Sequence, residues 1–139
     1  MLLGMGVAAA AAYSGQAVSA MPGHDHSKHT AQQPDLLNAM NDCLDKGQRC
    51  ITHCLVSFKE GDVALADCAA KVHEMHAICS AYSYLLTANS EYVKAYAPIC
   101  RQACEDCKKE CLKHEEHVEC KNCADACEAV IDQIALAFG

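Results

Sequence analysis

Aromatic residues are scarce in this sequence, which has no Trp, 2 Phe and 5 Tyr among 139 residues. So few rings argue against a surface that stacks on bases or sugars. Basic residues are also in the minority, with 11 Lys and Arg against 18 Asp and Glu, and the net charge of −7 argues against a nucleic-acid or anionic-membrane partner. The chain has no Gly-rich phosphate loop, no G-x-S-x-G turn and no H-E-x-x-H pair, so its motifs do not indicate an enzyme. The abundant chemically active residue is cysteine, with 12 copies.

The first 34 residues have the composition of segments that lie outside a fold. Residues 2–12 are apolar but too short to span a bilayer, and Val18-Ser19-Ala20 forms a small-x-small cleavage site. We therefore predict that residues 1–20 are a signal-peptide-like segment and that the mature protein is exported without a membrane anchor; an uncleaved apolar tail is the alternative. The usual basic region is missing, so we expect the true start to lie upstream. Residues 21–34 predict a flexible polar linker, in which His24, His26 and His29 could also hold Cu or Zn weakly.

From Pro34 onward the sequence favours helices, because Ala, Leu, Glu, Lys and Gln are frequent and no alternating strand pattern occurs. Helices are predicted over 35–58, over 62–88 with Asp62 as N-cap, over 91–113 with Ser90 as N-cap, and over 118–138. Pro98 lies inside the third helix, where it predicts a kink or a break into two helices. Residues 35–139 are thus expected to form one all-α domain, an antiparallel four-helix bundle.

The cysteines share one face on each predicted helix. At about 100° per residue, the three on the first helix fall within about 40° and the four on the third within about 60°. A purely structural core would use Leu and Ile, which bury more apolar area, so inward thiols indicate metal or disulfides. We predict that all twelve point into the core and serve as metal ligands: Cys43, Cys50, Cys54, Cys68, Cys79, Cys100, Cys104, Cys107, Cys111, Cys120, Cys123 and Cys127.

Several kinds of sulfur chemistry compete for this pattern. Neighbouring thiols on one helix do not readily adopt disulfide geometry, and iron–sulfur clusters prefer loops and a spacing other than that of residues 100–111. Zn(II) would use Cys104-x2-Cys107 and Cys120-x2-Cys123, with four thiolates for each ion. Cu(I) needs only two or three thiolates, and each of the four C-x3-C pairs supplies two from one turn of a helix. The spacing favours multiple Cu(I) ions, with a disulfide-stabilised or Zn(II)-binding structural protein as the alternatives.

Two stretches carry a resemblance to a known family. Cys43-x6-Cys50-x2-His53-Cys54, followed by Cys68-x10-Cys79 and Asn89-Ser90, resembles the exported copper storage proteins, and so does CEDCKKEC at 104–111 with ECKNCADAC at 119–127. The resemblance implies a bundle that stores many Cu(I) ions along its core. It also implies a periplasmic protein exported by the twin-arginine route, exchange of copper with copper-requiring enzymes or copper chaperones, and homo-oligomers. Val130, Ile131 and Ile134 stand where family members often continue the cysteine repeat, so the number of ions stays open.

The two ends of such a bundle differ in chemistry. One end would gather His53, His114 and His117, and we predict that His53 is a metal ligand at a mouth through which copper enters and leaves. His114 and His117 are interpreted as exposed loop residues. The other end would be a hydrophobic plug of Leu36, Met40, Leu86, Val93, Tyr96, Ile131, Ile134 and Phe138. Met75, on the stripe of Cys68 and Cys79, is interpreted as a core side chain rather than a thioether ligand.

Overall fold

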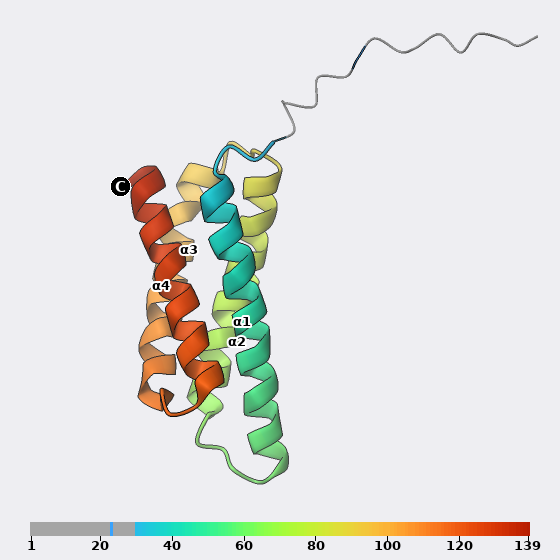
Figure 1. Ribbon diagram of the computed structural model, residues 1–139, viewed down its shortest axis with the longest axis vertical. Coiled ribbons are helices and arrows are strands. Elements are labelled where there is room, and N and C mark those ends of the chain that lie inside the picture. Colours follow the sequence, from blue (N-terminus) through green and yellow to red (C-terminus); the bar gives the residue numbers. More distant parts are fainter. Residues whose placement is uncertain (1–22, 24–29) are drawn as a thin grey trace, which may run out of the picture.

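Four long helices form an antiparallel bundle, as the sequence predicts. A computed structural model describes Gly23 and residues 30–139. The helices are α1 (Pro34–Lys59), α2 (Ala66–Thr87), α3 (Val93–Cys111) and α4 (Val118–Phe138), with a short 3₁₀ helix η2 (Leu112–His114) between the last two. Each long helix packs against two others, and short connections alternate between the two ends of the bundle (Figure 1). The predicted signal-like segment and His24, His26 and His29 lie outside the described residues.

Helices α2 and α3 begin a few residues later than predicted. The side chains expected to cap them instead stabilise turns that precede each helix. The Asp62 carboxylate accepts a hydrogen bond from the backbone N–H of Ala64 at 2.9 Å, and the Ser90 hydroxyl accepts one from Tyr92 at 3.2 Å. The prediction of Asp62 and Ser90 as N-caps is therefore wrong, because the same local hydrogen bonds suit a turn as well as a helix start.

Helix α3 also corrects two details. It runs through Pro98 as one helix, so a break into two helices does not occur. Pro98 is the sixth residue of the helix and removes one backbone donor there. The helix ends at Cys111 rather than at Lys113, because residues 112–114 tighten into η2.

The two ends of the bundle are closed differently. At the end where α2 connects to α3, the buried side chains of Leu36, Met40, Leu86 and Ile134 pack together, and Val93, Tyr96 and Phe138 lie partly buried against the core. We call this end the hydrophobic pole. Ile131, predicted to belong to this end, instead lines a surface groove with Lys108 and Leu112. Asn89, at φ +49° in the left-handed region, forms the turn there and binds the chain entering α1: its amide donates to Thr30 O at 3.1 Å and accepts from Gln32 N at 3.0 Å. The opposite end, where α1 leads to α2 and α3 to α4, is the histidine pole (bottom of Figure 1).

The outer faces of the helices are polar. Ion pairs one turn apart join Arg101 to Glu105 and Lys121 to Asp125, both at 2.8 Å. These four side chains lie on the outer faces of α3 and α4, away from the buried cysteines. Within residues 30–139, none of the helices combines the length and hydropathy that crossing a bilayer requires.

Tyr82 is an unusual core residue next to the hydrophobic pole. Its side chain is fully buried and stacks on Tyr96 with ring centroids 5.8 Å apart. Its hydroxyl has no hydrogen-bond partner among the described residues. Burial, followed by the nearby charge of Cys100, raises the pKa of this phenol, so it stays protonated. A buried donor without a partner destabilises the fold.

Replacing Tyr82 with Phe should therefore stabilise the protein without metal by about 1 kcal/mol, because the ring packing is kept and an unpaired hydroxyl is removed. Urea unfolding of the reduced protein measures this change. Tyr84→Phe, at a side chain that is 73% exposed, is the matched control and should leave the unfolding midpoint unchanged. A Tyr82→Phe protein less stable than the parent would show that the hydroxyl has a partner in solution.

Candidate metal centre

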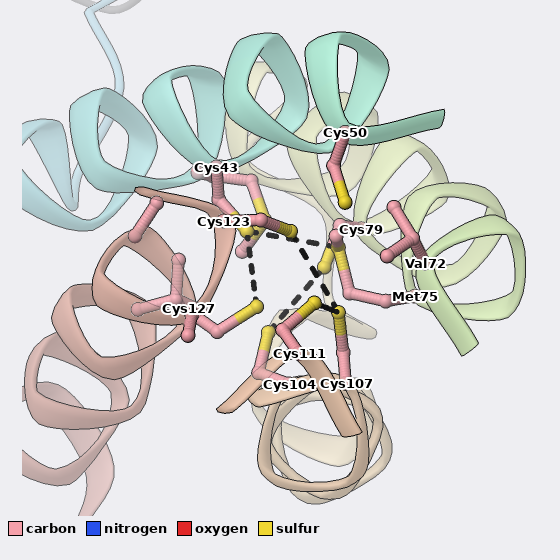
Figure 2. Packing of buried hydrophobic residues seen from close by; sticks show 14 of the residues in the cluster. Cys43, Cys50, Val72, Met75, Cys79, Cys104, Cys107, Cys111, Cys123 and Cys127 are labelled. Atoms are coloured by element: carbon pink, nitrogen blue, oxygen red, sulfur yellow. Dashed lines mark hydrogen bonds between the residues drawn. The ribbon is translucent and has the colours of Figure 1, made fainter. Parts of the chain in front are cut away.

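All twelve cysteines are buried inside the bundle, and none is accessible to solvent. Helix α1 contributes three thiols, α2 two, α3 four and α4 three, and each set lies on the face that its helix turns toward the others. In Figure 2 the side chains of Cys104, Cys107 and Cys111 point toward those of Cys123 and Cys127 across the core. Because all twelve side chains are buried, the prediction of an inward-facing set is confirmed, and the thiols are free. We call this set the thiol column.

The column consists of groups of three thiols, and neighbouring groups share one cysteine. Among the described residues, five groups of Cys place three sulfur atoms within 4.8 Å of one another. Counted from the hydrophobic pole, they are Cys79/Cys100/Cys104, Cys43/Cys104/Cys127, Cys107/Cys123/Cys127, Cys50/Cys111/Cys123 and Cys50/Cys54/Cys68. Each group has one cysteine in common with the next, so the five groups form one continuous path.

Contacts between helices tie the column together. The sulfur of Cys79 on α2 lies 3.5 Å from Cys100 and 3.6 Å from Cys104 on α3. At the other end Cys68 lies 3.6 Å from Cys111, and Cys50, Cys68 and Cys120 are 3.8–3.9 Å from one another. These distances fit weak S–H···S hydrogen bonds and exceed the ~2.05 Å of a disulfide bond. Sulfur atoms at this spacing can converge on a soft metal ion.

Several thiols of the column, among them Cys54 and Cys127, hold their protons at neutral pH. Burial raises the pKa of the Cys54 thiol to about 11, and the nearby charge of Cys68 adds to the shift. At Cys127, hydrogen bonds with other thiols, Cys104 first, and then burial raise the pKa. An ionised thiolate without a partner is costly in such a core, whereas a thiolate bound to a metal cation is not. A metal ion entering the column must therefore displace protons.

The side chains of the histidine pole contact one another more closely than the sequence predicted. His53 Nε2 lies 2.9 Å from His117 Nδ1, and His53 Nδ1 lies 3.6 Å from a carboxylate oxygen of Glu119. Both imidazoles are partly buried, and His114 is partly buried as well. Interpreting His114 and His117 as exposed loop residues was therefore wrong, because the short connection 115–117 folds His117 back onto α1. A groove of about 400 Å³ opens beside the pair and is lined by Gln48, Arg49, Thr52, His53, Val56 and Glu119.

The structure brings the predicted cysteine ligands together but leaves the predicted histidine ligand apart from them. The twelve cysteines gather in one column, whereas His53 lies at its end, with ring nitrogens directed at His117 and Glu119 rather than at a thiol. The sequence placed His117 at the same end as His53 and Met75 on the cysteine stripe of its helix, but it did not give their contacts. His117 lies against His53 because of the fold of the connection, and the Met75 sulfur lies 3.6 Å from the Cys43 sulfur because α2 packs against α1.

Comparison with known proteins agrees with this arrangement. The family described as copper storage protein matches residues 27–136, which include α1, α2, α3, all of α4 except its last two residues, and every cysteine. A similar protein is the uncharacterized cysteine-rich protein YhjQ of Bacillus subtilis (strain 168). It is 30% identical over 90 residues, which cover 65% of this chain and 81% of that protein.

The raised pKa of the Cys54 thiol predicts that the metal-free protein loses stability in alkali. Between the ordinary value of 9.0 and the pKa of about 11 at Cys54, the folded protein keeps a proton that the unfolded chain releases. Stability is therefore complete below about pH 9 and declines as the pH rises toward about 11. Urea midpoints of the anaerobic, reduced protein measure the decline, which should be smaller in Cys54→Ala. A midpoint that does not change across this window would contradict the prediction.

Proposed function

The chain belongs to the copper storage protein family, and from this premise we propose that it stores multiple Cu(I) ions as thiolate complexes along its core. The observation that carries the proposal is the continuous path of five cysteine triads through the bundle. Two or three thiolates are enough to bind one Cu(I) ion, so every group on the path can hold cargo. Storage requires no catalytic residues, and we propose that the protein is not an enzyme.

The cysteines that belong to two triads favour Cu(I) over Zn(II). Zinc sites in proteins are closed tetrahedra of four ligands, and twelve thiols would divide into three separate sets. In the bundle, Cys104, Cys127, Cys123 and Cys50 each belong to two triads instead. A thiolate that bridges two ions suits a row of closely spaced Cu(I) ions with low coordination numbers.

Charge balance in the buried core supports the same choice. A Cu(I) ion that replaces one thiol proton leaves the charge of the column unchanged. A Zn(II) ion with four thiolates would leave two negative charges in a core where the described residues include no buried cationic side chain. Electroneutral exchange also sets the capacity that we propose, about one Cu(I) for each of the twelve thiols.

We further propose that copper enters and leaves at the histidine pole. The hydrophobic pole is closed by packed apolar side chains, whereas the other end presents His53, His114 and His117 at the surface of the column. Imidazole and thiolate are both ligands for copper, so an ion can pass from one to the other by ligand exchange.

The proposals on localisation, domain division and partners rest on the sequence. Residues 1–20 are proposed to direct export to the periplasm by the twin-arginine route, residues 21–34 to be a linker, and residues 35–139 to be the storage domain. Copper-requiring enzymes or copper chaperones are the proposed exchange partners, and homo-oligomers are compatible with the proposal.

Counting thiols and copper in one sample tests the storage proposal. The anaerobically purified metal-free protein should show about twelve reactive thiols after unfolding, and titration with Cu(I) against a strong chelator should reach about one equivalent per thiol. A parallel Zn(II) titration is the control. Few free thiols would favour the disulfide alternative, and one to three tightly bound Zn(II) ions with little Cu(I) would favour a zinc protein.

Replacing His53 with Ala should change the rates of copper loading and removal several-fold and leave the capacity nearly unchanged, because His53 lies at the end of the column and not within it. Stopped-flow transfer of Cu(I) to a chelator measures the rate. His73→Ala, at an exposed position on α2, is the matched control. Equal rates in the parent and His53→Ala would place the route for copper elsewhere.

A further inference from the structure

Met75 brings a thirteenth sulfur atom to the thiol column. The residue lies in the middle of α2 and is fully buried. The thiol of Cys43 on α1 donates a hydrogen bond to its thioether sulfur at 3.6 Å. Cys43 also lies 3.8 Å from Cys127 and belongs to the triad with Cys104 and Cys127. Figure 2 shows Met75 reaching from α2 into the space that these thiols surround.

A glycine on the neighbouring helix makes room for this side chain. Gly47 is buried in the interior of α1, where glycine destabilises a helix by about 1 kcal/mol relative to alanine. A Cβ at position 47 would lie only 3.0 Å from the Met75 methyl carbon, closer than side chains normally pack. The space above Gly47 is thus filled by the end of the Met75 side chain, and this packing holds the thioether against Cys43.

Cys43, like Cys68 and Cys79, has no thiol partner four residues away on its own helix. Cys50 and Cys54 form a C-x3-C pair one turn apart on α1, but Cys43 is seven residues from Cys50 and has no such partner. The Met75 sulfur on α2 lies 3.6 Å from it, closer than the Cys127 sulfur at 3.8 Å. A thioether is a soft donor suited to Cu(I), and it has no proton to lose. It can therefore add a ligand without adding a negative charge to the core.

We propose that the Met75 thioether binds copper directly and completes the site formed by Cys43, Cys104 and Cys127. This inference rests on the proposed storage of Cu(I). It gives α2 a ligand at the level of this triad, whose thiols come from α1, α3 and α4. The site is then bounded by sulfur on all four helices.

Selenium in place of the methionine sulfur gives a direct test. The full-length protein is produced with selenomethionine, loaded with Cu(I), and examined by X-ray absorption at the selenium edge. We expect a selenium–copper scattering path in the parent protein. The path should disappear in Met75→Leu and remain in Met40→Leu, a matched control because Met40 is equally buried and lies at the hydrophobic pole. A fully loaded parent without the path, or a Met75→Leu protein that keeps it, would overturn the proposal.

Copper content and stability distinguish a failure of the Met75 proposal from a failure of the storage proposal and from misfolding of the variant. Leu and Met have similar volumes, so Met75→Leu should fold with nearly the same unfolding midpoint as the parent. It should bind copper at the other triads but yield one equivalent more readily to a competing chelator. If the parent protein itself binds no Cu(I), the storage proposal fails. If it fills normally and selenium has no copper neighbour, only the role of Met75 fails.

Discussion

Contact between sulfur atoms of different helices is the interaction on which the rest of this bundle depends. Thiols are small and weakly polar, so they can lie side by side in a core where charged groups could not. Their spacing of 3.5–3.9 Å draws the four helices around one axis. The ionised form of the same groups is costly to bury, and this cost is the reason why we propose monovalent soft cations, which replace protons one for one, as the stored ions.

The difference between the two poles follows from the small apolar area that a cysteine side chain buries. A thiol buries less apolar area than Leu or Phe, so the column alone contributes less hydrophobic stabilisation than an ordinary core. The bundle compensates at one end, where Leu36, Leu86 and Ile134 pack together and Asn89 binds the incoming chain. The histidine pole has polar contacts instead, such as the pairing of His53 with His117. The large apolar side chains are therefore concentrated at the hydrophobic pole, and the opposite pole carries the polar groups at which we propose that copper enters.

The sequence predicted those features that depend on the phase of a single helix. The inward direction of each cysteine and the bounds of α4 follow from a period of 3.6 residues. Features that depend on a second element were not accessible in this way. Asp62 and Ser90 have the residue types of helix caps but stabilise turns, and the thioether of Met75 meets Cys43 only because Gly47 lets α2 approach α1. The order of the triads likewise requires the relative heights of four helices, which helical phase does not give.

The cysteines that neighbouring triads share also determine the order in which metal ions could move along the column. Toward the histidine pole, Cys111 contacts both Cys68 and Cys107, so any two thiols there are joined by more than one route. Toward the hydrophobic pole there is one route, through Cys127 and then Cys104. Ions that move by exchange between neighbouring thiolates must pass these two in single file. With the proposed entry at the histidine pole, the ions that enter first would lie deepest and leave last.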